Sequence, residues 1–597
     1  KHEPGKPENA AFRQIRNYSS FLAPHGKLEH LKLPVLLLRG ILINFLIILP
    51  WILGLALATH WLMGGSGEWF WTKHPTLPAS LAPAASFLLT GVFGLVFLAL
   101  VVLFPIGRTI HRILNPNTDP HKFRGRYESF MAVVLLLTLG FTWIELQPFL
   151  LDAIEDRTAL VGKVSSALAG TSALLATFTH VLARNLSKIL SRFGLYLVAL
   201  LALAAFWLLY LLLVLWLMEE PGLMRACAAA LIALFFYTNL FVDANGLSLH
   251  NFYKDRLSDA FIFDHDQETD SVDTSSDPRL TELANCGVGP FHLINTTLNT
   301  REFPENFRKG RRGEPFLLSP RHFGSRITGY SPTEELEKEQ PEVRLSTAIA
   351  TSGAAVSSNM GTQTTHVLRL ILSVLNIRLG YWLINPLATR SKGAEKFWFA
   401  VGKRIRAGVF RVLQELTGFI SYRTSYVYLS DGGHIDNLGL YELVRRQCRF
   451  IVIGDGECDP NYHFKGLADA LRLIRTDFGV VVEMEGLDEI RSGEQQYARG
   501  TIYYPDERVG YLIYLKSSSL GDDMIEATVS PGAYESSPLR SDVRRFDELT
   551  YMAHYKAENP DFPQETTADQ FFDEVQFEAY RALGYVIAER ALTKDHN

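Results

Sequence analysis

The sequence predicts a bundle of membrane-spanning helices joined to an α/β domain. Two observations carry this prediction. Between residues 41 and 242 lie several apolar runs, two of which exceed the roughly 20 residues that a helix needs to cross a bilayer. After residue 243 the runs become shorter, and β-rich segments alternate with helical ones, as in α/β domains. The chain has 597 residues, 48% of them hydrophobic, which is enough for both parts.

The charge balance and the cysteine content exclude several classes of protein. The chain carries 58 basic and 63 acidic side chains and no basic nucleic-acid motif, so we expect no nucleic-acid partner. Its four cysteines form no Cys-x-x-Cys pair and no cluster with histidines at zinc-ligand spacing. We therefore expect no disulfide framework, no metal and no cofactor.

Six apolar runs are candidate membrane spans. The two longest cover residues 41–63 and 195–218. The others cover 87–104, 130–151, 158–182 and 226–241, and for each shorter run the alternative is a buried core helix. Glu145 and Lys163 lie inside two of these runs, which could indicate a transport path. No internal repeat supports a transporter, so we favour an interfacial location or mutual pairing for both.

The distribution of basic residues predicts how these runs are oriented. Lys and Arg are concentrated before the first run, between the second and third, and between the fourth and fifth. The intervening loops, at 64–86, 152–157 and 219–225, hold few of them. By the positive-inside rule this pattern predicts six spans with both flanks in the cytoplasm. Residues 1–32 are polar, with no secretory signal and no initiator Met, and we expect the natural sequence to continue upstream.

The most informative stretch of the α/β part lies around Asp431. Residues 426–429 are typical of a strand, Gly432 and Gly433 of a tight turn, and 437–447 of a helix that Asp436 or Asn437 caps. Residues 449–453 are expected to return as a buried strand. The carboxylate of Asp431 would then lie at the carboxyl end of a strand, where open α/β sheets place their sites. An Asp-Gly-Gly turn alone is also ordinary turn chemistry.

Several stretches resemble the patatin-like phospholipases, particularly their large, membrane-embedded bacterial members. The segment LSDGGHIDNLGLYEL at 429–443 is similar to the aspartate block of that family. Further similar stretches are IRNYSSFLAP (15–24), LSLHNFYKDRL (247–257), AIATSGAAVSSNMG (348–361), RLGYW (378–382) and TADQFFDEVQFEAYR (567–581).

The resemblance implies a three-layer α/β hydrolase domain with a Ser-Asp dyad. In such a dyad the serine attacks an ester carbonyl and the aspartate is the base, which maps to Asp431. Gly432, Gly433 and Gly353 would shape the site. His434 is interpreted as structural or pocket-lining. The domain would be discontinuous, with 1–40 and 243–597 as soluble parts, 41–242 as the membrane part and 264–278 as a solvated acidic loop.

The chain departs from the family pattern in its nucleophile. The Gly-rich oxyanion loop and the Gly-x-Ser-x-Gly elbow of the family are absent from the 597 residues. Ser352 follows a β-rich run at 345–349 and lies between small residues, so it is the best local candidate for the nucleophile. The block that contains it is a separate scaffold feature in the family. We therefore expect the serine to come from an upstream segment or a separate chain, and the domain to be incomplete at its N-terminal side.

These observations lead to two hypotheses. The first is a serine acyl hydrolase of the phospholipase or lysophospholipase type, embedded in the bacterial inner membrane, with its soluble domain in the cytoplasm and membrane phospholipid as substrate. The alternative is a catalytically inactive membrane scaffold or interaction protein that retains the hydrolase-like fold. The sequence upstream of Lys1 discriminates between them, because a Gly-x-Ser-x-Gly elbow there favours the enzyme.

Overall fold

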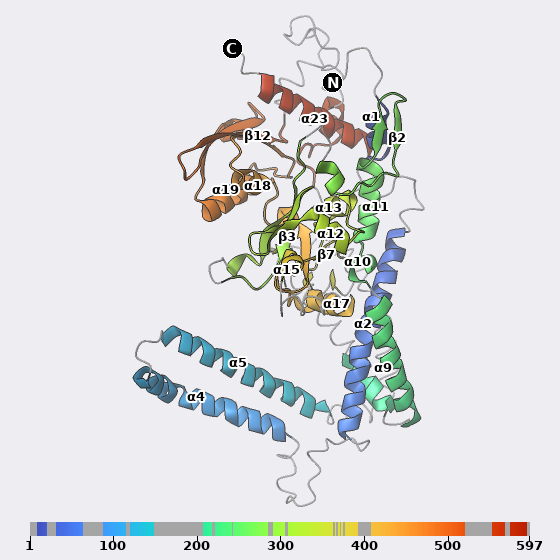
Figure 1. Ribbon diagram of the computed structural model, residues 1–597, viewed down its shortest axis with the longest axis vertical. Coiled ribbons are helices and arrows are strands. Elements are labelled where there is room, and N and C mark those ends of the chain that lie inside the picture. Colours follow the sequence, from blue (N-terminus) through green and yellow to red (C-terminus); the bar gives the residue numbers. More distant parts are fainter. Residues whose placement is uncertain are drawn as a thin grey trace, which may run out of the picture. The chain divides into compact units, whose positions relative to one another are not determined.

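A computed structural model gives the fold of the chain (Figure 1). It describes residues 9–20, 32–63, 87–114, 120–147, 207–217, 221–241, 243–284, 290–304, 309–361, 364–365, 368–369, 372–373, 376–391, 408–519, 552–566 and 573–593. The chain divides into two units. One consists of Lys1–Phe45 with Thr238–Asn597, and the other is Leu46–Tyr237.

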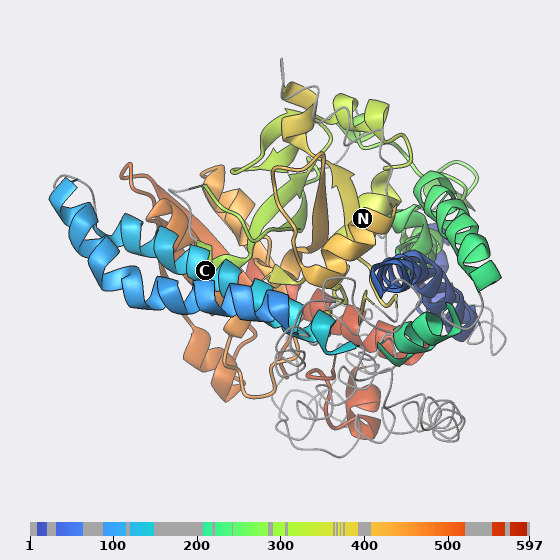
Figure 2. The ribbon, with the colours of Figure 1, turned by 90° about the horizontal axis from the view of Figure 1, so that it is seen from below.

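Long apolar helices form the unit Leu46–Tyr237. The helices α4 (Leu88–Leu114) and α5 (Pro120–Glu145) lie side by side (Figures 1 and 2), where the rings of Phe93 and Phe141 stack 4.9 Å apart. The second half of α2 (Lys32–Met63) packs against the helix Trp207–Leu217 through Ala56 and Val214. The last helix of this region is α9 (Pro221–Phe241).

Four of the six predicted spans fall on these helices, at least in large part. They are the runs at 41–63, 87–104, 130–151 and 226–241. Of the run at 195–218, residues 207–217 are described and helical, while 158–182 lies outside the described residues. Among the described residues one helix, Leu38–Trp61, has the length and hydropathy of a membrane span. A single helix of this kind also occurs in soluble proteins, so six spans stay a prediction.

The structure gives Glu145 a role at a helix terminus. Its carboxylate accepts the backbone N–H groups of Leu89 at 2.8 Å and Thr90 at 3.0 Å. These N–H groups belong to the first turn of α4, where no carbonyl of the helix can reach them. Glu145 therefore caps the neighbouring helix, and Lys163 lies outside the described residues.

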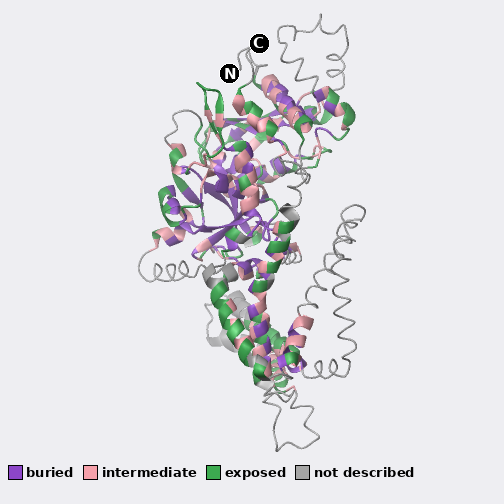
Figure 3. Ribbon diagram, turned by 90° about the vertical axis from the view of Figure 1, so that its right-hand side faces the viewer, coloured by how far each residue is buried: buried purple, intermediate pink, exposed green. Residues whose placement is uncertain are grey.

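A six-stranded sheet forms the core of the other unit. Its order is β6-β5-β4-β3-β8-β7, and every neighbouring pair is antiparallel. Figure 3 shows its strands largely buried, as expected for a central layer. The strands are β3 (Ile294–Asn299), β4 (Gly313–Leu318), β5 (His322–Ser325), β6 (Gly329–Pro332), β7 (Tyr381–Ile384) and β8 (Tyr426–Asp431).

A second sheet has the order β10-β11-β12-β9. It consists of β9 (Phe450–Asp455), β10 (Val481–Glu485), β11 (Tyr497–Tyr503) and β12 (Val509–Lys516). The strand expected at 449–453 exists as β9, but it pairs in parallel with β12 and lies in a different sheet from β8. Its residues alternate between buried and exposed, so the expectation of a fully buried strand was wrong. This unit thus contains both sheets and helices, as the α/β prediction requires, but β8 and β9 do not belong to one open sheet.

Shorter elements surround the two sheets. The helices are α10 (Ala244–Leu247), α11 (His250–Phe261), α12 (Thr333–Glu339), α13 (Leu345–Ser352), α15 (Pro386–Arg390), α17 (Gly408–Thr417), α18 (Leu440–Arg445), α19 (Lys465–Phe478), α20 (Leu487–Ser492) and α23 (Glu574–Thr593). Three 3₁₀ turns are η4 (Thr281–Ala284), η5 (Lys309–Arg311) and η7 (Gly432–His434).

The N-terminal helix α1 (Ala10–Asn17) folds against elements from the distant end of the chain (Figure 1). Arg16 forms an ion pair with Glu578 of α23, and Gln14 donates to the carbonyl of Asp259 in α11. Arg13 contacts Asp270 at 3.1 Å. Residues from the first and the last of the similar stretches, 15–24 and 567–581, therefore meet in one unit.

The acidic stretch at 264–278 is more ordered than a solvated loop. Its first part forms a two-stranded hairpin of β1 (Asp264–Asp266) and β2 (Ser271–Asp273). Asp270 accepts from α1, and Asp277 accepts from the backbone N–H and the hydroxyl of Ser346 at 3.1 Å and 2.7 Å. Two of its carboxylates thus accept hydrogen bonds from the helices α1 and α13.

Candidate active site

Asp431 is the last residue of β8, which lies between β3 and β7 in the sheet. In the register of the sheet it lies opposite Thr296 of β3. The chain then turns through η7, and the carboxylate of Asp431 accepts the N–H of Gly433 at 2.6 Å. The predicted strand and turn are therefore present. Since this sheet is antiparallel, the rule that places sites at the carboxyl ends of parallel strands does not apply to it.

Close contacts, and not backbone angles, favour glycine at both positions of the turn. A Cβ on Gly432 would lie 2.6 Å from the carbonyl oxygen of Asn295, which belongs to the backbone and cannot move aside cheaply. A Cβ on Gly433 would meet the side chain of Asn437 first and Oδ1 of Asp431 at 3.1 Å, so side-chain packing disfavours a larger residue there. Neither glycine has a positive φ, so the predicted tight turn is present without a left-handed backbone.

Burial raises the pKa of Asp431 to about 6, and the hydrogen bond from Gly433 opposes this shift. Tyr253 of α11 lies near enough for the negative charge of Asp431 to affect its pKa. Burial raises the pKa of Tyr253 to about 12, with a further contribution from Asp431. Gly353 leaves room for this tyrosine, because a Cβ there would lie 2.9 Å from its hydroxyl oxygen. Sequence reasoning missed Tyr253, since nothing in its local pattern links α11 to Asp431.

Ser352 does not occupy a nucleophile elbow. Residues 345–352 form the helix α13 and not a strand, so the strand-to-helix turn expected before Ser352 is absent. The apolar residues Leu345, Ala348 and Ile349 have helical spacing, and Asp277 satisfies the N-terminus of this helix. The hydroxyl of Ser352 donates to the carbonyl of Asn295 at 2.7 Å, and in the described part of the chain no hydrogen bond joins it to Asp431.

His434 is a buried structural residue. Its Nε2 lies 3.2 Å from the carbonyl of Ala355, and its Nδ1 lies 2.8 Å from the hydroxyl of Ser430. A carbonyl can only accept, so Nε2 carries the proton and Nδ1 accepts from Ser430. Asn299 in turn donates to this hydroxyl at 2.9 Å. Burial lowers the pKa of His434 to about 4, which keeps the ring neutral at physiological pH.

Asp436, one of the two residues expected to cap the next helix, accepts N–H groups at its start, although the N-cap residue itself is Gly439. Its two carboxylate oxygens accept the backbone N–H groups of Leu438 at 3.2 Å and Tyr441 at 2.8 Å, at the start of α18. The helix itself is shorter than predicted, because it covers Leu440–Arg445. Asp431 and Asp436 thus lie in one short segment with different surroundings.

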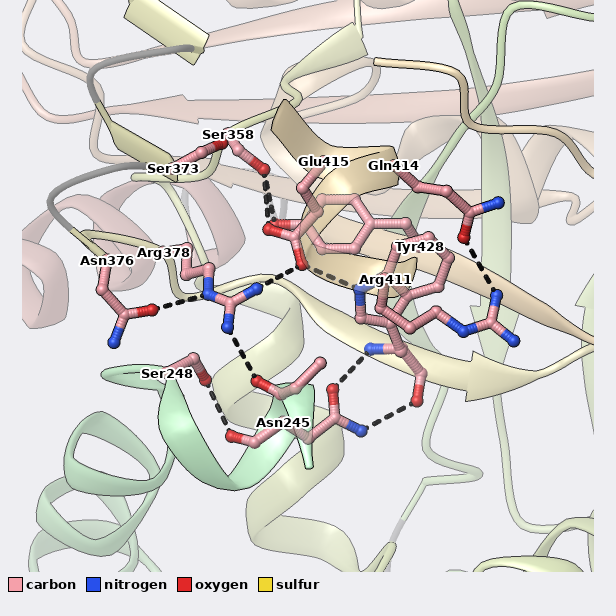
Figure 4. A network of polar contacts seen from close by, with 12 residues as sticks. Asn245, Ser248, Ser358, Ser373, Asn376, Arg378, Arg411, Gln414, Glu415 and Tyr428 are labelled. Carbon is pink, nitrogen blue, oxygen red and sulfur yellow. Dashed lines mark hydrogen bonds and ion pairs between the residues drawn. The ribbon is translucent and has the colours of Figure 1, made fainter. Parts of the chain in front are cut away.

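A buried polar network fixes the strands beside Asp431 (Figure 4). At its centre Arg378 forms an ion pair with Glu415 of α17 at 2.6 Å, with side chains that are 2% and 1% exposed. Glu415 also accepts from the indole of Trp382 in β7 at 2.8 Å and from Ser358 at 2.9 Å. Asn245 of α10 exchanges two hydrogen bonds with the backbone of Trp382. The stretches 348–361 and 378–382 thus meet around β7 and β8.

Among the residues that the structure describes, no group of three or more His, Cys, Asp or Glu side chains could hold a metal ion. The arrangement offers instead the carboxylate of Asp431 at the end of β8, whose pKa burial raises to about 6. Burial likewise raises the pKa of Glu314 in β4 of the same sheet, to about 7. No protein-family model, curated protein or solved structure matches the chain.

Proposed function

We propose that the chain carries the general base of a membrane-embedded, patatin-like serine acyl hydrolase of the phospholipase or lysophospholipase type. Asp431 carries this proposal. A carboxylate with a pKa of about 6 is ionised at neutral pH and still holds a proton well, which suits a base. The shape of the turn does not depend on this charge, because close packing against the backbone of Asn295 requires Gly432.

The chemistry needs one serine. As its oxygen bonds to the ester carbonyl carbon, Asp431 takes the serine proton, and it then returns that proton to the leaving alcohol as the ester bond breaks. Water attacks the acyl-serine in the same way and restores both groups. Fixed N–H donors must stabilise the oxyanion. We propose that the serine and these donors lie outside the 597 residues, since Ser352 binds Asn295.

The exposed surface of the helical unit supports a location in the lipid bilayer. Large apolar side chains are exposed along α4, α5 and α9, among them Leu95 at 69%, Leu136 at 68% and Phe236 at 57%. Apolar patches of this kind favour contact with lipid or protein over water. We propose the cytoplasmic membrane of a bacterium, a cytoplasmic active site and a phospholipid substrate drawn from the bilayer.

The test compares two aspartates of the same segment in the complete protein. Asp431→Asn keeps the shape and the N–H acceptor but removes the base, so hydrolysis of phospholipid and nitrophenyl esters should fall by about two orders of magnitude or more. Asp436→Asn is the matched control and should lower stability while the rate per folded molecule persists. Equal losses in both variants would refute the assignment of Asp431.

One observation favours the alternative, a membrane scaffold without activity. The best candidate for the nucleophile, the hydroxyl of Ser352, donates a hydrogen bond to a backbone carbonyl. In the described part of the chain, the hydrogen-bond partners of Asp431 include no hydroxyl that could act as the nucleophile. A scaffold of this kind predicts no ester hydrolysis in any form of the protein. It also predicts that Asp431→Asn is silent in every functional assay.

A further inference from the structure

Glu314 of β4 carries a carboxyl group that is buried without a hydrogen bond. The residue is 2% exposed, and its Oε1 accepts no hydrogen bond from any residue that the structure describes. An ionised carboxylate in such a place costs much more free energy than a neutral carboxyl group, because a charge loses more hydration than a dipole does. The surroundings of Glu314 therefore favour its protonated form, and burial raises its pKa to about 7.

A second carboxylate, that of Asp477, binds the positive groups beside Glu314. Arg311 of η5 donates to both oxygens of Asp477, at 2.8 Å and 2.6 Å, and Arg326 donates to it at 3.3 Å. The hydroxyl of Tyr441 donates to the same carboxylate at 3.0 Å. Burial alone would raise the pKa of Asp477, but the hydrogen bond and the charge of Arg311 lower it. The two carboxyl groups therefore differ in charge around neutral pH, with Asp477 ionised.

These contacts connect the two sheets of this unit. Arg311 and Glu314 belong to the first sheet and the turn before it, whereas Asp477 lies in the last turn of α19. The helices α18 and α19 pack together on the second sheet. Tyr441 of α18 also donates its backbone N–H to Asp436 at 2.8 Å. The cluster thus links β4 to α19 and to the segment that follows Asp431.

The other titratable groups of the elements around β4 do not bind Glu314. Burial raises the pKa of Tyr330 in β6 to about 12, with contributions from Glu442 of α18 and from Glu314, so this tyrosine stays neutral. The turn η7 contributes His434, β5 contributes the exposed His322, and β3 has no titratable side chain. Across the described residues, none of these side chains forms a hydrogen bond with Glu314. Asp477 and its two arginines are therefore the charges that respond to Glu314.

We propose that Glu314 is a pH-sensitive switch, whose ionisation weakens the contact between β4 and α19. While Glu314 is protonated, Arg311 and Arg326 bind the carboxylate of Asp477 without competition. Once Glu314 is ionised, either it competes with Asp477 for these guanidinium groups or it stays buried as an unpaired charge. Both outcomes destabilise the contact. The switch involves no acyl hydrolysis, so it stands or falls apart from the proposed activity.

The contact should lose stability as the pH rises. Folding raises the pKa of Glu314 from 4.5 to about 7, so the contact is most stable below pH 4.5 and weakens as the pH rises through 7. From pH 6 to pH 8 the equilibrium constant for opening the contact should increase about tenfold by this linkage. Glu314→Gln is neutral at every pH and should abolish the increase.

Hydrogen exchange of the full chain in detergent, followed by mass spectrometry, measures this opening constant in α18 and α19. Measurements at pH 6, 7 and 8 are corrected for the intrinsic pH dependence of amide exchange. Glu335→Gln removes an exposed carboxyl group of α12 and provides the matched control, which should respond to pH like the wild type.

A second variant tests the competition between the two carboxyl groups. Asp477→Asn frees Arg311 and Arg326 to pair with Glu314, so the pH-dependent step should move below pH 6, while the contact as a whole weakens. A purely structural role of Glu314 would leave this step in place. A wild-type opening constant that does not change between pH 6 and 8, or that rises equally in Glu314→Gln, would overturn the inference.

Discussion

Asp431 and Asp436 show how the surroundings of one residue decide its role. Burial raises the pKa of both carboxyl groups. Asp436 accepts several N–H groups at the start of α18, which stabilise its charged form and give it a structural purpose. Asp431 accepts a single N–H, so its ionised form is poorly stabilised by hydrogen bonds. We propose that this poorly stabilised charge at the end of β8 serves as the base.

The first prediction concerns the free energy of folding that the ionised form of Asp431 costs the protein. Since folding raises the pKa of Asp431 from 3.8 to about 6, the folded state favours its protonated form. The contribution of this group to the free energy of unfolding is therefore fully present below pH 4. It is lost as the pH rises from 4 to 6, by an amount on the order of 2 to 3 kcal/mol. Asp431→Asn should remove this loss. Urea unfolding at pH 7 should find the variant at least as stable as the wild type.

The same comparison at pH 4 serves as its control, because the wild-type carboxyl group is then largely protonated and the two proteins should have similar stability. An Asp431→Asn variant that is clearly less stable than the wild type at pH 7 would contradict the unfavourable charge. Asp436→Asn should be destabilised at pH 7, since one amide oxygen cannot replace two carboxylate oxygens.

At the scale of elements, local sequence patterns predicted some structures and missed others. The strand at Tyr426–Asp431 and the cap by Asp436 follow from β-branched and aromatic residues and from a polar side chain before an apolar helix face. The helix α13 was misread as β-rich, although its apolar spacing is helical. Its N-terminal partner, Asp277, comes from a distant stretch, and no local pattern shows such a contact.

The sheet assignment of β9 could not be predicted for a similar reason. Strand identity depends on local composition, whereas pairing depends on which partner buries the apolar face. β9 buries Ile451 and Ile453 against the cluster that includes Leu473 and Leu512, so it joins β12 and not β8. The polar network around Arg378 and Glu415 likewise joins residues that are far apart in sequence.

The second prediction concerns the helix pair α4 and α5. Glu145→Ala removes the acceptor of two N–H groups at the start of α4, so the protein should lose about 1 kcal/mol or more of stability. Glu145→Gln keeps one acceptor oxygen and should lose less. Thermal unfolding followed by circular dichroism in detergent measures both. A Glu145→Ala variant as stable as the wild type would exclude the capping role.

At the scale of the whole molecule, the two ends of the sequence fold into one unit and residues 46–237 form another. Contacts such as Arg16 with Glu578 make this possible, and they cannot be inferred from periodicity or composition. An insertion that leaves both flanks on one side of a membrane requires an even number of spans. The alternation of basic loops, which is an independent property of the sequence, predicts six.

The third prediction follows from that topology. Single cysteines introduced at 64–86, 152–157 and 219–225 should react with a membrane-impermeant reagent from outside the cell, because these loops alternate with the basic ones. Cysteines at 105–129 should react only after permeabilisation and provide the matched control. A cytoplasmic location of 152–157 would remove the fourth span and break the even count.

The most direct test of the account asks whether Asp431 serves a serine that lies outside residues 1–597. These residues, purified in detergent, are compared with the product of the complete gene, using a serine-directed fluorophosphonate and ester hydrolysis as the two readouts. We predict that the 597 residues alone are neither labelled nor active, because a base cannot replace a missing nucleophile. The longer product should be labelled, and Asp431→Asn should slow both readouts. Labelling of the 597 residues that disappears in Ser352→Ala would contradict the account, and labelling of neither protein would favour the scaffold.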